Sequence, residues 1–175
     1  LDDPAFASEV PYYITQIYYL LGQFDEVIRF APSAIENAEK LKTPEMNQLI
    51  GDAYFRVGRY DEAIVYLEQF HKSGKPTRED KYQLGFAYLK ANYFEKAAQM
   101  LGRVTQKDDD LAQIAAYHIA EAHMKMDRKD LALTAFRRAS EVGTDQKIKE
   151  DALFNFAVLS YETDFNPYNQ AIRAF

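Results

Sequence analysis

Small and apolar residues recur along this chain in a pattern that repeats about every 35 residues. Three stretches align without gaps: GDAYFRVGRYDEAIVYL from Gly51, GFAYLKANYFEKAAQML from Gly85 and AEAHMKMDRKDLALTAF from Ala120. An upstream stretch, TQIYYLLGQFDEVIRFA from Thr15, fits the same frame, and AVLSYETDFNPYNQAIRAF from Ala157 fits it with two extra residues. Such a period is typical of stacked helix pairs, and the pattern predicts about four and a half of them.

The repeats fill nearly the whole chain, so we expect a single repeat domain over residues 1–175. The units cover approximately 8–43, 44–77, 78–112 and 113–149, followed by an incomplete unit over 150–175. The closing run FNPYNQAIRAF predicts an amphipathic helix that stops about two or three turns after it begins. We therefore expect the chain to be a fragment of a longer protein.

Small residues mark the points where the two helices of a pair should approach closely. They are Gly51, Gly85, Ala120 and Ala157 in the first helices and Ala63, Ala97 and Ala132 in the second. Each first helix should end at a residue that tolerates a left-handed conformation, namely Gly22, Gly58, Asn92 or Asp127. Large or apolar residues of the second helices should pack onto the next pair: Leu67 and Phe70, Leu101 and Val104, Phe136 and Ala139.

Two prolines and an acidic run qualify this pattern. Pro32 falls inside the second helix of the first unit, where it should kink or split the helix. Pro11 stands where the first helix is expected to begin, a position that tolerates proline. The run Asp108–Asp110 precedes a helix, and a capping role with favourable dipole charge is the preferred interpretation over a cation site.

The pattern resembles the tetratricopeptide-repeat (TPR) family, whose consensus carries small, Tyr, Gly, Tyr or Phe, and Ala residues at these offsets. The second unit matches at Gly51, Tyr54, Gly58, Tyr60 and Ala63. The third unit keeps Gly85, Tyr88, Phe94 and Ala97, whereas the fourth has His123 in place of the Tyr. The resemblance implies an all-α, right-handed superhelical solenoid of antiparallel helix pairs.

In that family the first helix of each pair lines a concave groove, and the fifth, ninth and twelfth positions of the unit are exposed there. We call these positions the first-helix stripe: Tyr12, Gln16, Tyr19, Gln48, Asp52, Phe55, Tyr82, Phe86, Leu89, Tyr117, Glu121, Met124, Phe154, Val158 and Tyr161. Eleven of these fifteen residues are aromatic, Leu, Met or Val. An exposed apolar stripe indicates a binding surface. Alternatively, tight curvature buries several of the rings against adjacent first helices.

The resemblance therefore implies a scaffold that binds a protein or peptide with apolar anchors. Family members that clamp chaperone carboxylates use Lys at the fifth and Asn at the ninth position, and this chain has neither there. The clamp function is therefore not expected. The alternative function is self-association, or packing against another part of the same protein.

Composition narrows the choice of partner. The net charge of −6 and the pI near 5.1 exclude nucleic acid as an expected partner, because phosphate binding needs a basic surface. The chain has no cysteine and no apolar run long enough to insert into a membrane. The tyrosine-rich units resemble bacterial TPR arrays of the cell envelope, which favours the periplasm over the cytoplasm.

The sequence offers little enzyme chemistry. No nucleophile-elbow, phosphate-loop or dinucleotide motif is present, so we expect neither an enzyme nor a cofactor. His118, Glu121 and His123 share one helix, but His123 points roughly 140° away from His118, which disfavours a metal site. His123 occupies the repeat's Tyr position, and we expect it to be a packed, hydrogen-bonded core residue.

Overall fold

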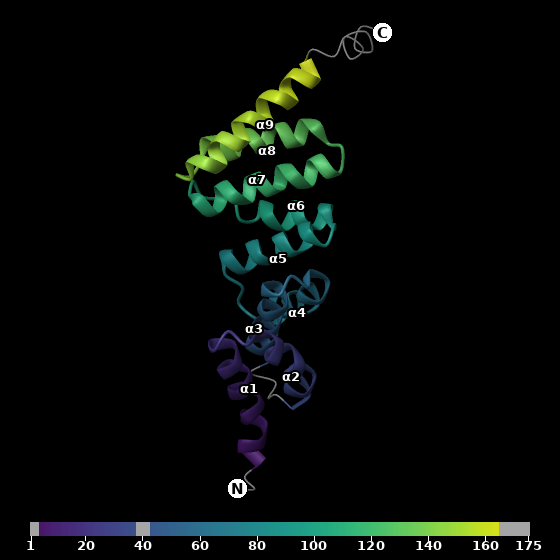
Figure 1. Ribbon diagram of the computed structural model, residues 1–175, viewed down its shortest axis with the longest axis vertical. Coiled ribbons are helices and arrows are strands. Elements are labelled where there is room, and N and C mark those ends of the chain that lie inside the picture. Colours follow the sequence, from purple (N-terminus) through teal and green to yellow (C-terminus); the bar gives the residue numbers. More distant parts are fainter. Residues whose placement is uncertain (1–3, 38–42, 165–175) are drawn as a thin grey trace. The chain divides into compact units, whose positions relative to one another are not determined.

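The computed structural model describes residues 4–37 and 43–164. Within these ranges the chain forms nine helices and no strand (Figure 1): α1 (Pro4–Leu20), α2 (Phe24–Asn37), α3 (Thr43–Arg56), α4 (Tyr60–Ser73), α5 (Arg78–Lys90), α6 (Phe94–Gly102), α7 (Asp110–Lys125), α8 (Lys129–Glu141) and α9 (Gln146–Asp164). They belong to two compact units, residues 1–77 with α1 to α4 and residues 78–175 with α5 to α9. The fold class is all-α, as the repeat pattern predicts.

In the first unit each helix packs against the next one along the chain, and the first helices α1 and α3 also contact each other. Its interior contains fully buried residues from α2, α3 and α4: Val27, Ala31, Ala34, Met46, Ile50, Ala53, Ala63 and Leu67. Helices of this length are marginal in water on their own, so this shared burial stabilises them.

The second unit repeats the arrangement from α5 to α9, with further contacts between the first helices α5 and α7 and between α7 and α9. Leu101 in the last turn of α6 and Val104 in the turn that follows form one buried cluster with Ala115 of α7. Phe136 of α8 forms another with Leu159 of α9. The expectation that second-helix residues pack onto the next pair is confirmed for Leu101, Val104 and Phe136, and it stays a prediction for Leu67 and Phe70.

Two glycines bring the helices of a pair into close contact. A Cβ atom at Gly51 would lie 2.8 Å from Cγ of Leu67, and one at Gly85 would lie 2.7 Å from Cγ of Leu101. These distances are too short for a methyl group, so both positions require the absence of a side chain. The predicted close approach is confirmed, and a leucine of the second helix of the same pair fills the space.

The predicted ends of the first helices are confirmed as well. The left-handed φ values are 69° at Gly22, 77° at Gly58, 64° at Asn92 and 56° at Asp127. At the end of α5, the Tyr93 amide donates to the carbonyl of Tyr88 at 2.8 Å, and the same hydrogen bond follows the other three turns. This pattern satisfies helix carbonyls that would otherwise lack a donor.

The two expectations about proline have different outcomes. Helix α1 begins at Pro4 and continues through Pro11, so Pro11 lies in its interior and the expectation that it stands at the helix start is wrong. Pro32 lies inside α2 as expected, and the helix is continuous from Phe24 to Asn37, so it is not split, while a kink at Pro32 stays a prediction. A proline removes a single backbone donor, and the hydrogen bonds on either side keep the helix intact.

The predicted closing helix FNPYNQAIRAF, residues 165–175, lies outside the described residues. Among the described residues, no helix combines the length and the apolar character that crossing a membrane requires.

Candidate binding surface on the first helices

The first unit carries six residues of the first-helix stripe, and all six are half-buried: Tyr12, Gln16, Tyr19 on α1 and Gln48, Asp52, Phe55 on α3. The Gln16 side-chain amide donates to the Tyr12 hydroxyl at 2.7 Å. The Tyr19 hydroxyl donates to the carboxylate of Asp52, which joins the two helices. These polar contacts partly occupy the stripe of the first unit.

A guanidinium from the chain itself completes this contact. Arg56 forms an ion pair with Asp52, and its Cζ atom lies 5.8 Å from the ring centre of Tyr19 and 5.2 Å from that of Phe24. Burial, followed by the hydrogen bond to Asp52, raises the pKa of the Tyr19 phenol. In the first unit, therefore, two rings and a carboxylate hold one arginine side chain.

The second unit places four rings together on α5 and α7. The ring centres of Tyr82 and Phe86 are 6.1 Å apart. His118 contacts both, with ring centres 6.1 Å from Tyr82 and 4.9 Å from Phe86. The ring centre of Tyr117 lies 6.0 Å from that of His118. His118 is thus the centre of an aromatic cluster that spans two neighbouring first helices.

A carboxylate lies beside this cluster. The Nδ1 atom of His118 is 2.6 Å from Oε2 of Glu121, and the side chains of His118 and Glu121 are 14% and 39% exposed. Burial, with a further contribution from the charge of Glu121, raises the pKa of Tyr82 to about 12. Burial and then Glu121 and Asp151 raise the pKa of Tyr117. An accessible negative charge therefore acts on both phenols.

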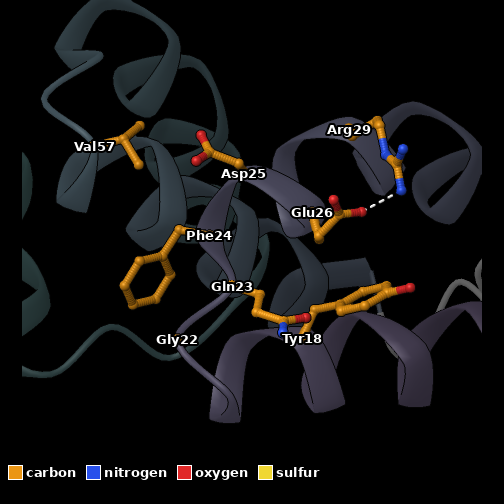
Figure 2. A pocket seen from close by; sticks show the side chains of 8 residues that line it. All are labelled: Tyr18, Gly22, Gln23, Phe24, Asp25, Glu26, Arg29 and Val57. Atoms are coloured by element: carbon orange, nitrogen blue, oxygen red, sulfur yellow. Dashed lines mark hydrogen bonds and ion pairs between the residues drawn. The ribbon is translucent and has the colours of Figure 1, made fainter.

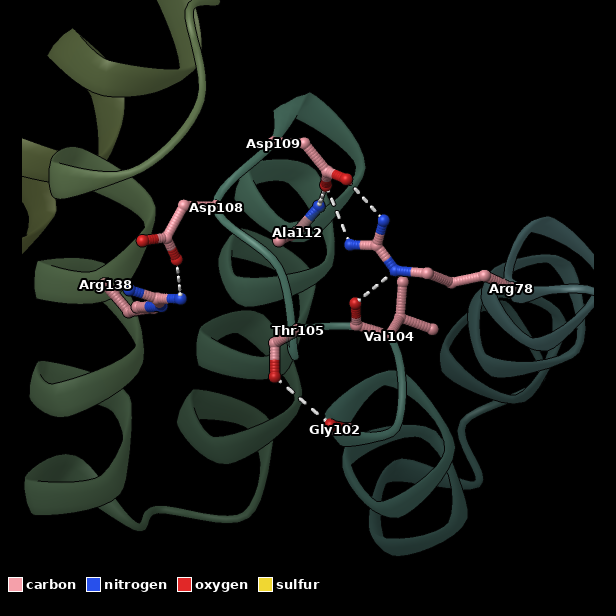
Figure 3. A network of polar contacts seen from close by, with 8 residues as sticks. All are labelled: Arg78, Gly102, Val104, Thr105, Asp108, Asp109, Ala112 and Arg138. Carbon is pink, nitrogen blue, oxygen red and sulfur yellow. Dashed lines mark hydrogen bonds and ion pairs between the residues drawn. The ribbon is translucent and has the colours of Figure 1, made fainter.

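The acidic run before α7 has a structural role (Figure 3). Asp109 caps the helix by accepting a hydrogen bond from the amide of Ala112 at 2.9 Å, which confirms the capping prediction. The same carboxylate pairs with Arg78, whose Nε donates to the carbonyl of Val104 at 2.7 Å. Asp108 pairs with Arg138. The carboxylates of Asp108 and Asp109 therefore connect helices.

An open pocket of about 580 Å³ lies at the turn between α1 and α2 in the first unit (Figure 2). It is lined by Tyr18, Gly22, Gln23, Phe24, Asp25, Glu26, Arg29 and Val57. Glu26 and Arg29 form an ion pair with each other. The pocket includes no residue of the first-helix stripe, and its lining brings together no acid–base pair suited to catalysis.

Comparisons with known proteins agree with the repeat architecture. Residues 56–139 match the family described as anaphase-promoting complex, cyclosome, subunit 3. The fold is similar to YrrB, described as a TPR protein with an unusual peptide-binding site, with a TM-score of 0.71 and 17% identity over 91% of this chain and 79% of that one. The chain folds as a tetratricopeptide-repeat array.

A second similar TPR structure is MamA AMB-1, with a TM-score of 0.66 and 12% identity over 95% of this chain and 94% of that one. No curated protein matches the sequence. At these identities the structural matches establish the fold and leave the partner of this TPR array open.

The residues of the first-helix stripe differ in exposure. On α9, Phe154 is 68% exposed and Tyr161 is 67% exposed, and Met124 on α7 is 41% exposed. Tyr82, Phe86 and the remaining α7 stripe residues are half-buried. Leu89 is only 7% exposed, so the expectation that it is accessible is wrong. Neighbouring first helices contact each other, so the space between them is narrower than in an open groove.

Sequence reasoning missed His118 as part of this surface. His118 lies one position after Tyr117 and outside the stripe, so the sequence indicated only a disfavoured metal-ligand role for it. Among the described residues, no group of three or more His, Asp or Glu side chains could hold a metal ion. The signal that could have found His118 is its position three residues before the stripe residue Glu121, because residues three apart lie on one helix face.

His123, at the repeat's Tyr position, is packed but is not hydrogen-bonded as expected. Its Nδ1 atom is buried and has no hydrogen-bond partner in the described part of the chain. Burial, followed by the charge of Arg128, lowers the pKa of His123 below its usual 6.5, while Glu95 opposes the shift. An imidazole in place of the phenol thus leaves a buried nitrogen without a partner.

We expect His123→Phe to reduce the loss of stability on acidification. The folded protein resists protonation of His123, so the unfolded chain binds more protons once the pH falls below 6.5. The wild-type free energy of unfolding should therefore decrease as the pH falls below that value, relative to the variant. Urea unfolding at neutral and mildly acidic pH measures the difference. Parallel pH profiles for the two proteins would contradict the assignment.

Proposed function

We propose that this TPR array is a non-enzymatic scaffold that binds a protein or peptide segment through the first-helix stripe of residues 78–162. The observation that carries the proposal is the cluster of Tyr82, Phe86, Tyr117 and His118 across two first helices. Tyrosine and phenylalanine offer a large contact area at a low entropy cost, which is why they dominate binding hot spots.

Exposed apolar residues beside the cluster extend this surface. Phe154, Val158 and Tyr161 are exposed on α9, which packs against α7. A segment with apolar anchors would cover rings that now face water, and the gain comes from removing that apolar surface from solvent. The description of YrrB as a TPR protein with a peptide-binding site supports the same use of the fold. The periplasmic location inferred from sequence stays a prediction.

We expect replacement of Tyr82 and Phe86 together by alanine to weaken binding by about 2–4 kcal/mol, which is the range of hot-spot residues. The probes are peptides selected from a random display library against the intact chain and then synthesised. Fluorescence anisotropy measures their affinity. Removing both rings also removes the face on which His118 packs, so circular dichroism must show that the variant stays folded.

Leu131→Ala is the matched control, because Leu131 is 49% exposed on the second helix α8 and lies outside the stripe. It should bind the peptides as the wild type does. Equal binding by Tyr82→Ala/Phe86→Ala and by the wild type would show that the stripe is not the binding surface. Light scattering on the same samples tests the alternative, since a mass that rises with concentration would indicate self-association.

A further inference from the structure

In the first unit, a carboxylate and two aromatic rings on neighbouring helices bind an arginine side chain. Asp52 occupies the ninth position of its repeat, and the guanidinium of Arg56, four residues later, pairs with it and lies over the rings of Tyr19 and Phe24. A guanidinium is flat and always charged, so it stacks on aromatic faces and pairs with a carboxylate at the same time. Here the chain satisfies this site itself.

The equivalent position in the fourth repeat is Glu121, and its contact differs. Lys125 follows four residues later in the last turn of α7, but among the described residues the side chain that contacts Glu121 is the imidazole of His118. The Glu121 side chain is 39% exposed, so its carboxylate can still be reached from solvent. The site therefore has a carboxylate with accessible surface, and no arginine within the described part of the chain pairs with it.

Two tyrosine rings lie near this carboxylate through their contact with His118. Tyr82 and Tyr117 each lie about 6 Å from His118, the residue that contacts Glu121. The charge of Glu121 contributes to the raised pKa of both phenols, which agrees with their proximity. Asp151 on α9 is exposed and acts on Tyr117 in the same way, so a second negative charge lies near the rings.

We propose that Glu121, Tyr82 and Tyr117 form a subsite for an arginine side chain of the partner segment. The guanidinium would pair with the Glu121 carboxylate and lie against the phenol rings, while neighbouring apolar residues of the segment contact Phe154 and Tyr161. The net charge of −6 favours such a basic segment over an acidic one. This inference rests on the proposed function, because it assigns a ligand group to part of the same surface.

The test uses the selected peptides and the intact chain. Peptides that bind should contain an arginine close to an apolar anchor. Glu121→Gln keeps the size of the side chain and an acceptor for His118 but removes the charge, and it should weaken binding about tenfold. Replacing the peptide arginine by citrulline, its neutral isostere, should cause a similar loss. When Glu121→Gln is tested against the citrulline peptide, the loss of affinity should be little larger than for either change alone, because each change removes the same interaction.

Glu141→Gln is the control, because it makes the same charge change on an exposed residue at the end of α8. It should leave the affinity unchanged, which separates the local contact from the overall charge. If Tyr82→Ala/Phe86→Ala weakens binding but Glu121→Gln and citrulline do not, the arginine subsite is wrong and the proposed function stands. If no selected peptide depends on Tyr82 and Phe86, both proposals are wrong.

Discussion

Replacing Gly143 by alanine should destabilise the second unit by about 2–4 kcal/mol, through backbone strain and overpacking together. Gly143 has a left-handed φ of 71°, which an alanine adopts at a cost of about 1 kcal/mol. The added Cβ atom would also lie 2.7 Å from Cβ and 2.8 Å from Cδ of Gln113. Urea unfolding followed by circular dichroism measures the change in the free energy of unfolding.

Gln113 cannot move aside freely. It is fully buried, and its side-chain amide donates to the carbonyls of Ala139 at 3.2 Å and Asp145 at 3.0 Å. Its oxygen accepts from the amide of Asp145 at 3.0 Å. Any shift that relieves the clash lengthens these bonds and leaves polar groups unsatisfied, which costs about 1–3 kcal/mol for each buried group.

Gly58→Ala is the reference for backbone strain alone. Gly58 has a φ of 77°, but a Cβ atom there would meet nothing within 4 Å. Its variant should lose only about 1 kcal/mol. A loss at Gly143 no larger than that at Gly58 would show that Gln113 accommodates the methyl group, and the overpacking argument would fail.

The repeat period was enough to predict the helix pairs, because the residue type at each fixed offset of the repeat meets a specific structural requirement. A glycine, asparagine or aspartate ends a first helix, and the left-handed φ values at Gly58 and Asn92 follow from that requirement. Gly51 and Gly85 recur because a leucine of the paired helix occupies the space of their missing side chains. Such local rules repeat along the chain and can be recognised without a structure.

The details of the surface could not be predicted in the same way, because they depend on single side chains that break the repeat. Gln113 and His118 match no consensus position. Gln113 nevertheless connects α7 to the turn before α9, and His118 is the centre of the aromatic cluster. Leu89 is likewise buried although it stands at a stripe position. Spacing gives the face of a residue and not its distance to the neighbouring helix.

Gly85 and Leu101 should show strong coupling in a double-mutant cycle. Leu101 is fully buried, so Leu101→Ala should cost about 2–5 kcal/mol, from lost burial and a cavity. Gly85→Ala places a Cβ atom 2.7 Å from Cγ of Leu101 and 3.2 Å from its backbone nitrogen. That clash should exceed the gain of about 1 kcal/mol in helix propensity, so this variant should also be destabilised.

The double variant should be more stable than the sum of the two single losses by at least about 1 kcal/mol. Once the leucine side chain is gone, the methyl group introduced by Gly85→Ala occupies the space that the leucine filled, and the helix keeps the propensity gain. Gly58→Ala in place of Gly85→Ala is the control, because a Cβ atom at Gly58 would meet nothing within 4 Å and Gly58 belongs to the other compact unit, so its cycle with Leu101→Ala should be additive. Urea unfolding measures the free energy of unfolding of each variant. If the losses of Gly85→Ala and Leu101→Ala are additive, the packing of Leu101 does not require a glycine at position 85.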